Sequence, residues 1–141
     1  LVAGESPLSG SKLRGLAEAQ GFVLDGGQFH ARDDAGSTLY TLSSLDAEQF
    51  SADTMKSLQT HGVTLLLDVP TVAEGSRQFD RMVTVAEQLA QTLGARVVDD
   101  NRHPLSAQSL AVIRSKIAEF QGRMVRFGIQ PGSDAARRLF S

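Results

Sequence analysis

Two pairs of adjacent aspartates, Asp33-Asp34 and Asp99-Asp100, have the side chains that acid–base catalysis and metal binding require. Paired carboxylates can donate and accept protons or hold a divalent cation. Both pairs fall in predicted turns, where aspartate is favoured because it hydrogen-bonds its own backbone. We therefore interpret both pairs as structural and predict that the chain has no catalytic residue.

The three histidines, His30, His61 and His103, do not form a metal-binding pattern. None has a second histidine or a glutamate at the spacing that places two ligands on one helix face. The chain has no cysteine, so it has neither a thiolate nucleophile nor a thiolate ligand. We predict no metal site and no cofactor.

The segment 99–103 is the most polar cluster in the sequence and supplies one alternative function. Its acidic pair is followed by Arg102 and His103, and together these groups can orient a small substrate. Neither a Gly-x-Ser-x-Gly nucleophile motif nor a phosphate-binding glycine-rich loop accompanies it. A small-ligand or enzymatic domain using this loop is the alternative, while our prediction is that the chain is not an enzyme.

A predicted strand from Val63 to Val69 has apolar side chains on both of its faces. Alternate residues point to opposite faces of a sheet, so its odd-numbered positions already supply a complete core face. Leu66 projects from the opposite face beside Thr64, where Leu45 and Phe29 are expected to join it. Monomeric proteins rarely leave such a contiguous apolar patch exposed, so the pattern predicts a docking surface unless a helix or the C-terminal tail covers it.

The remaining periodicities predict helices that cover only one face of this sheet. A first helix follows Ser9 or Ser11, an amphipathic helix spans Ser76 to Leu93, and a third helix is capped by Ser106. We predict one kinked strand over 22–32, bent at Gly26-Gly27, and a hairpin that joins it to a strand over 38–45. The order of elements indicates an α+β domain of the split β-α-β type with one open sheet face.

The composition of the 141-residue chain is that of a globular protein. Its 41% of hydrophobic residues is enough for a single core. The 14 Lys and Arg against 16 Asp and Glu leave no excess of cations for phosphates, so we predict no nucleic-acid partner. No window approaches about 20 consecutive apolar residues, so we expect a soluble segment and place any membrane anchor upstream.

The C-terminal residues differ in character from the rest of the chain. We predict a domain over 1–121 and a tail over 122–141, because four arginines face one aspartate there and glycines and a proline interrupt any helix. The tail also has enough apolar residues to occupy the open face itself. We treat that occupation as a hypothesis from composition.

Several segments resemble the C-terminal domain of the bacterial division protein ZipA. The resemblance rests on five segments: Gly21-Phe22, Gly62 to Pro70, the helix from Phe79 through Ala86, Val97 to Arg102, and Leu105-Ser106. It covers about Val2 to Phe120. It implies an antiparallel sheet of about six strands with three helices on one face, whose bare face binds the C-terminal tail peptide of FtsZ.

The family's peptide groove falls on six positions of this sequence. They are Gly27, Phe29, Ser43, Leu45, Thr64 and Leu66. Gly27 stands where a family member has methionine, Leu66 stands where it has phenylalanine, and no lysine follows Leu45. We therefore expect a shallower and less basic groove.

The resemblance also implies a cellular role that the residues alone do not indicate. It implies an upstream inner-membrane helix with a flexible linker, which would place this domain on the cytoplasmic face at the division site and tether FtsZ there. We expect a monomeric domain. The second alternative is self-association through the outward Leu45 and Leu66.

Overall fold

The computed structural model describes residues 7–45, 49–51, 53–55 and 57–140. Its elements are short strands and longer helices in an α+β arrangement, which confirms the predicted fold class. In chain order they are β1 Leu8–Ser9, α1 Gly10–Ala19, β2 Val23–Asp25, β3 Gln28–Arg32, β4 Thr38–Ser44, β5 Gln59–Thr60, β6 Val63–Leu66, the 3-10 helix η1 Val69–Thr71, α2 Gly75–Leu93, α3 Ala107–Arg126 and α4 Asp134–Phe140. The strand expected at residues 1–3 lies outside the described residues.

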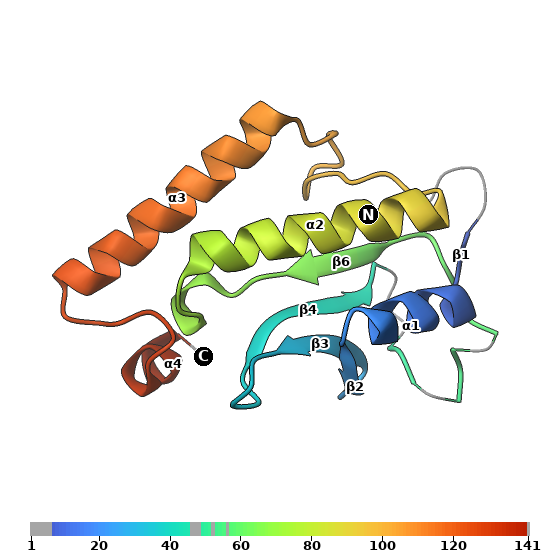
Figure 1. Cartoon of the computed structure of the whole chain (residues 1–141), viewed down its shortest axis with the longest axis horizontal. Helices are drawn as coiled ribbons and strands as arrows, with labels where there is room; N and C mark the ends of the chain where they lie inside the picture. Colours follow the sequence, from blue (N-terminus) through green and yellow to red (C-terminus); the bar gives the residue numbers. More distant parts are fainter. Residues whose placement is uncertain (1–6, 46–48, 52, 56, 141) are drawn as a thin grey trace.

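The main sheet has four antiparallel strands in the order β2-β3-β4-β6 (Figure 1). A separate pair, β1 with β5, brings the described strands to the expected six, but in two sheets instead of one. In the main sheet Phe29 pairs with Leu42, and Leu42 pairs with Leu65. Because paired residues point to the same face, this register places three large apolar side chains on one side of the sheet.

That side of the sheet forms the hydrophobic core. Phe29 and Leu42 are completely buried, and the Phe29 ring lies 5.5 Å from the ring of Phe50, measured between centroids. Tyr40 continues the same face and contacts Phe22 edge-on at 5.8 Å. The core is thus set by β3 and β4 in the middle of the sheet.

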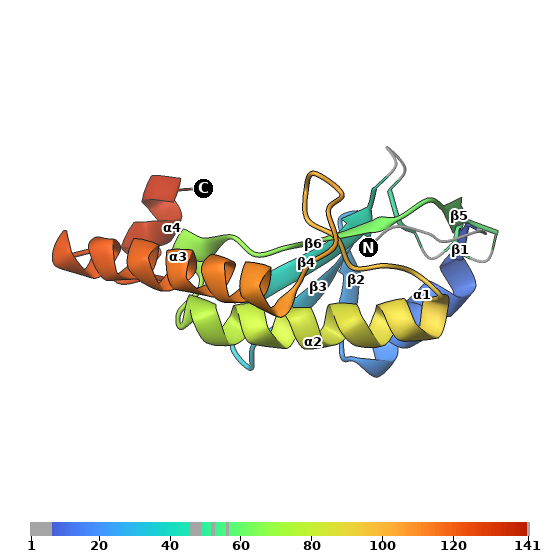
Figure 2. The same cartoon turned by 90° about the horizontal axis from the view of Figure 1, so that it is seen from above.

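Two helices cover the core face, as Figure 2 shows below the sheet. The periodic stripe of α2 buries Phe79, Val85, Ala86 and Leu89, and α1 adds Leu13 and Ala17. The third helix, α3, begins at the predicted cap, where Ser106 accepts a hydrogen bond from the Ser109 N–H at 3.1 Å. Its main contacts are with α2 and η1, so it packs against the helical layer.

Two predicted strands have different boundaries in the structure. The region 22–32 is a hairpin and not one kinked strand, because Gly26 and Gly27 both take positive φ angles, of 61° and 85°. Two such residues in succession form the tight turn that matches the twist of a hairpin. The strand predicted over 63–69 ends at Leu66, because Pro70 lies in η1 and cannot donate a ladder hydrogen bond.

The C-terminal residues also depart from the prediction. Helix α3 continues through Gly122 to Arg126, across the boundary predicted between the domain and the tail. Residues 134–140 form α4, whose Ala136 is completely buried. The tail does not lie over the outer sheet face, because α4 contacts η1 and leaves Leu66 61% exposed.

One side chain of α3 holds the start of α2 in place. The Gln121 amide donates to the carbonyls of Val69 and Val72, each at 2.9 Å, and its oxygen accepts from the Gly75 N–H at 2.9 Å. The contact is so close that a Cβ on Gly75 would lie 2.6 Å from the Gln121 side-chain nitrogen. Gln121 therefore satisfies three backbone groups that a connecting segment would otherwise leave unpaired.

We expect Phe29→Ala and Leu66→Ala to differ sharply in their effect on the free energy of unfolding. Phe29 is completely buried, so its truncation should cost about 3–5 kcal/mol. Leu66 is largely exposed, so its truncation should change stability by less than about 0.5 kcal/mol. Urea unfolding of both variants measures the difference, and equal small losses would place Phe29 outside the core.

A second pair of variants tests the Gln121 contacts. Gln121→Ala should cost about 1–3 kcal/mol, because it leaves three partly buried backbone groups without partners. Gln108 is an exposed glutamine in the first turn of the same helix, and Gln108→Ala is the matched control that should cost little. Similar midpoints of unfolding for the two variants would contradict this role.

Candidate peptide-binding face

The outer face of the sheet carries an apolar strip where β4 meets β6. Thr41 pairs with Leu66 and Ser43 pairs with Thr64, so these four side chains share the face opposite the core. Leu66 is 61% exposed and Leu45, just after β4, is 40% exposed. The strip therefore combines two large apolar side chains with small hydroxyl residues between them.

A hollow of about 340 Å³ lies between this strip and the loop that connects α2 to α3. Its lining residues come from both sides: Leu45, Val63, Thr64, Leu65, Leu66, Val98, Asp99, Asp100 and Arg102. Figure 2 shows this loop rising on the side of the sheet opposite α1 and α2. The loop therefore forms one wall of a shallow groove whose floor is the apolar strip.

The shape of the loop is determined by Asp99. Its Oδ1 atom accepts from the N–H groups of Asn101 at 2.9 Å and of His103 at 2.8 Å, and its own N–H donates to the His103 carbonyl. A bridge between Val98 and Pro104 closes the loop at its base. The carboxylate of Asp99 is therefore used to hold a turn, as predicted for this acidic pair.

Arg102 occupies the left-handed region of backbone space, with a φ angle of 64°. This conformation is unfavourable for a residue with a side chain, and such residues cluster at functional sites. The strained backbone places an exposed guanidinium at the wall of the hollow. Arg102 thereby supplies a cation at the groove, where the resemblance to the family had implied none from this loop.

The other half of the outer face, formed by β2 and β3, is mostly polar, although Val23, which pairs with His30, is 46% exposed there. The Arg32 guanidinium donates to the Asp25 carboxylate at 2.8 Å and lowers the pKa of that carboxyl below its usual value. His30 lies between the Thr38 hydroxyl at 3.1 Å and the Asp25 carbonyl at 3.0 Å. These contacts satisfy polar side chains of this half within the sheet.

The six residues predicted for the groove separate into two groups. Ser43, Leu45, Thr64 and Leu66 lie together on the outer face, as the alternation of the strands indicated. Phe29 does not, and its expected outward position is wrong, because its pairing with Leu42 turns it into the core.

Gly27 also stands apart from the strip. It lies in the turn between β2 and β3, and a Cβ there would meet the Gln49 side chain at 2.9 Å. Its carbonyl accepts from the Phe50 N–H at 3.0 Å. The absence of a side chain at this position thus admits residues 49–50 instead of deepening a groove.

The sequence did not indicate that the loop over 98–102 forms a wall of the groove. The charge density of its residues indicated a separate small-ligand loop. The signal that could have joined the two is the short apolar pair before Asp99, whose Val98 lines the hollow together with Val63. Among the described residues no group of three His, Asp or Glu side chains is placed to hold a metal ion, and no described helix is long and apolar enough to cross a membrane.

Arg102 offers a test of backbone strain at the groove. Arg102→Gly should be more stable than Arg102→Ala by about 1 kcal/mol, because glycine takes a positive φ angle without steric cost and alanine does not. Both variants remove the same cation, so their difference isolates the backbone. Thermal and urea unfolding measure it, and equal stabilities would show that Arg102 is not strained.

Comparison with known proteins connects this fold to a family. The family model described as ZipA, C-terminal FtsZ-binding domain, matches residues 1–116. Three relatives bear the name Cell division protein ZipA. The protein of Colwellia psychrerythraea is 32% identical over 96 residues, covering 65% of this chain and 25% of the relative.

The other two relatives give similar values. The protein of Vibrio vulnificus is 30% identical over 125 residues, covering 84% of this chain and 40% of the relative. That of Ectopseudomonas mendocina is 31% identical over 91 residues, covering 64% and 33%. The chain thus spans a quarter to two-fifths of the length of these curated relatives.

The family model covers the whole main sheet and both helices on the core face. Its description is that of a binding domain of a cell-division protein, which confirms the prediction that the chain is not an enzyme. The family it names is also the one that the sequence resembles. The chain belongs to the family of ZipA C-terminal FtsZ-binding domains.

Proposed function

We propose that the chain binds the C-terminal tail peptide of FtsZ on the apolar strip of the outer sheet face. The family description names FtsZ as a ligand of the family. The observation that carries the proposal is the exposure of Leu66 and Leu45 beside a hollow that no described segment of the chain fills. Ser43 and Thr64 lie between them and allow a peptide backbone to approach closely.

The expected affinity follows from the size of the strip. A short amphipathic peptide that buries about 600 Å² of apolar area over both partners gains about 15 kcal/mol at about 25 cal/mol per Å². Loss of overall motion and ordering of the peptide cost about 5–10 kcal/mol, which leaves a dissociation constant near the micromolar range. Apolar anchors of this kind predict a weak dependence on salt.

The wall of the hollow adds polar selectivity to these anchors. Arg102 presents a cation, while Asp99 and Asp100 present carboxylates on the same loop. Because both signs are present, the wall favours a peptide with charges of both signs. Arg102 also reduces the repulsion that the two aspartates would exert on a strongly acidic peptide. The wall also partly replaces the lysine that does not follow Leu45 in this sequence.

The cellular role that we propose is attachment of FtsZ at the division site. In this proposal the chain is the FtsZ-binding part of a longer protein anchored in the inner membrane, and it works on the cytoplasmic face. Many copies on one membrane would raise the effective strength of a micromolar contact, because each further binding event is intramolecular. A modest affinity for a single peptide is therefore sufficient.

Two alternatives use the same region of the molecule. A small-ligand site in the 99–103 loop is disfavoured because Asp99 is occupied with backbone N–H groups and the His103 side chain is 77% exposed. Self-association through Leu45 and Leu66 would occupy the same strip as the peptide. Sedimentation velocity at several concentrations separates these cases, because only self-association predicts a dimer that Leu66→Asp dissociates.

Calorimetric titration of the FtsZ tail peptide into the 141-residue chain tests the proposal. We expect a dissociation constant near the micromolar range and at least about a tenfold weakening in Leu66→Asp, because the variant places an unpaired charge where an apolar side chain is buried. The change should appear in affinity and not in protein stability, since Leu66 is exposed in the free chain.

Leu139→Asp is the matched control. Leu139 is 64% exposed, nearly as much as Leu66, but it lies in α4 and not on the sheet. Peptide affinity should be unchanged in this variant. Equal weakening by both variants, or no binding at high micromolar peptide, would reject the outer sheet face as the binding site.

A further inference from the structure

The charges of the chain are unevenly divided between its two parts. Residues 112–141 contain six Lys and Arg against Glu119 and Asp134, whereas residues 1–111 contain eight against fourteen acidic residues. The net charges are therefore +4 and −6, which together give the −2 of the whole chain. Such asymmetry is typical of proteins that contact an anionic surface with one part.

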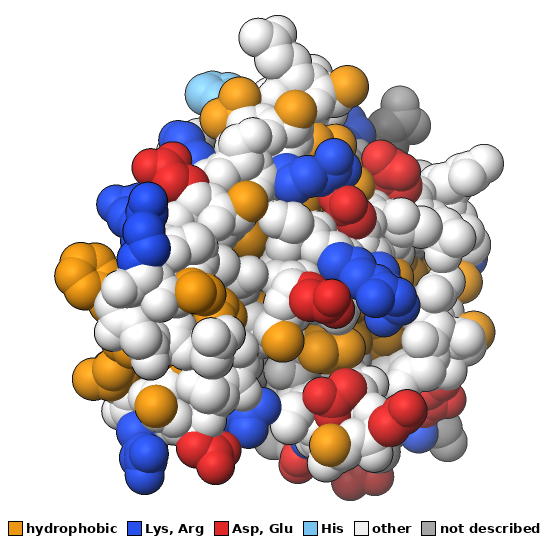
Figure 3. All heavy atoms as spheres, turned by 60° about the vertical axis from the view of Figure 1, so that its left-hand side comes forward, with side chains coloured by type: hydrophobic (Ala, Val, Ile, Leu, Met, Phe, Trp, Pro, Cys, Tyr) orange, Lys and Arg blue, Asp and Glu red, His pale blue; other side chains and the backbone are white. Residues whose placement is uncertain are grey.

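Residues 112–141 also carry most of the exposed large apolar side chains of the described chain. Five of the eight exposed ones lie there: Val112, Val125, Phe127, Leu139 and Phe140. Phe127 is 82% exposed, more than any other large apolar residue of the described chain. Figure 3 faces this end of the molecule and shows hydrophobic side chains among Lys and Arg.

Two of these side chains, Phe127 and Phe140, lie in one apolar hollow between α3 and α4. Phe120, Met124, Phe127, Ile129 and Phe140 line a hollow of about 280 Å³ together with Arg123. The rings of Phe120 and Phe140 contact each other edge-on at 6.2 Å, which joins α3 to α4. Phe120 also lines a second apolar hollow with Val69 and Pro70, so the surface continues along α3.

Arginines surround this surface, and not all of them are paired with acidic side chains of the described chain. Arg126 and Arg138 are exposed and form no ion pair with another described residue, while Arg123 lies 3.8 Å from Glu119. Two of the arginines, Arg123 and Arg126, lie in the last turn of α3, where they interact favourably with the negative end of the helix dipole. Arg137 lies 3.8 Å from Asp134 and donates to the Ser37 hydroxyl, and Arg138 lies in the last turn of α4. None of these contacts explains the exposure of Phe127.

We propose that this basic apolar surface, formed by the C-terminal half of α3 together with α4, docks on a bilayer that contains anionic phospholipids. Arginine guanidinium groups bind lipid phosphates, and aromatic and leucine side chains enter the boundary between headgroups and acyl chains. Nucleic acid would need the cations but not Leu139 and Phe127. A second copy of the same surface would bring like charges together.

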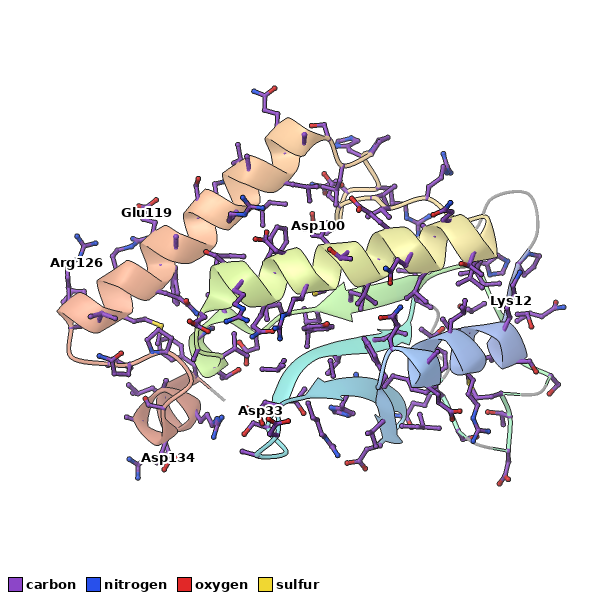
Figure 4. All side chains as sticks on the ribbon, in the orientation of Figure 1. Lys12, Asp33, Asp100, Glu119, Arg126 and Asp134 are labelled. Atoms are coloured by element: carbon purple, nitrogen blue, oxygen red, sulfur yellow. The ribbon has the colours of Figure 1, made fainter. Side chains whose placement is uncertain are left out.

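The docking surface is separate from the peptide-binding face. The family model ends at residue 116, and the residues that carry the exposed aromatic rings and four of the six cations follow it. The apolar strip lies on β4 and β6, whereas these residues lie on α3 and α4 at one end of the molecule (Figure 4). The inference therefore does not rest on FtsZ binding.

Co-sedimentation with lipid vesicles tests this proposal on the 141-residue chain. The probes are vesicles of phosphatidylcholine alone and vesicles that also contain phosphatidylglycerol. We expect binding to the anionic vesicles that weakens about tenfold or more when salt rises from about 0.1 M to about 0.5 M, and little binding to the neutral ones. Equal binding to both kinds, or none to the anionic kind, would overturn the proposal.

Two pairs of variants locate the contact. Arg126→Glu should weaken vesicle binding about tenfold or more, whereas Lys12→Glu makes the same change of charge at the far end of the molecule and should have little effect (Figure 4). Phe127→Ser should also weaken vesicle binding, whereas Leu66→Ser should not. Equal effects within either pair would overturn the proposal.

Two other partners give distinct results with the same variants. Binding of a single-stranded DNA oligonucleotide that exceeds vesicle binding and survives Phe127→Ser would assign the surface to nucleic acid. A dimer in sedimentation velocity that Phe127→Ser dissociates would assign it to self-association. Each result would overturn lipid docking, and unchanged unfolding midpoints confirm that the variants are folded.

Discussion

The pairing of Phe29 with Leu42 and of Leu42 with Leu65 is the constraint on which the rest of the structure depends. A strand shifted by one residue would turn every side chain to the opposite face, so this register commits three large apolar residues to the same side. The completely buried Phe29 and Leu42 make any other register costly. Helices α1 and α2 then cover that side, and the outer face of β4 and β6 is left with Leu66, Thr64 and Ser43.

This division of faces explains how one short strand serves both stability and binding. In β6, Val63 and Leu65 face the core while Thr64 and Leu66 face outward, and the strand ends at the Pro70 segment before a further pair can form. The connection from α2 to α3 then places the 98–102 loop beside the outer residues. The groove is thus a consequence of a packed sheet on one side and a turn held by Asp99 on the other.

Local patterns were sufficient for much of this account. Alternation correctly assigned the two faces of β4 and β6, and three-and-four spacing with a serine cap located α2 and the start of α3. Phe29 was misplaced because the Gly26-Gly27 turn was interpreted as a bend, which changes the phase of the following strand. The alternation within a single strand does not show which of its two faces will point into the core, because pairing with the neighbouring strand determines that.

Contacts between residues far apart in the sequence could not be predicted from local patterns. Gln121 pairs with backbone groups about fifty residues earlier, and nothing in its own neighbourhood indicates those partners. The change in composition after Gly122 suggested a tail, but α3 continues past it to Arg126 and packs against α2 and η1, as tertiary contacts often override weak propensities. The wall formed by Arg102 likewise depends on where a loop comes to lie.

The central claim is that the apolar strip on the outer sheet face is the binding site for the FtsZ tail. Nuclear magnetic resonance of the isotope-labelled chain, titrated with the tail peptide, tests it most directly by locating the contact residue by residue. We expect the amide signals of the apolar strip and of the 98–102 loop to shift on titration, while those of α4 stay in place. The residues of the strip are Ser43, Leu45, Thr64 and Leu66. Shifts concentrated on β2 and β3 or on α3 and α4, with the strip unchanged, would contradict it.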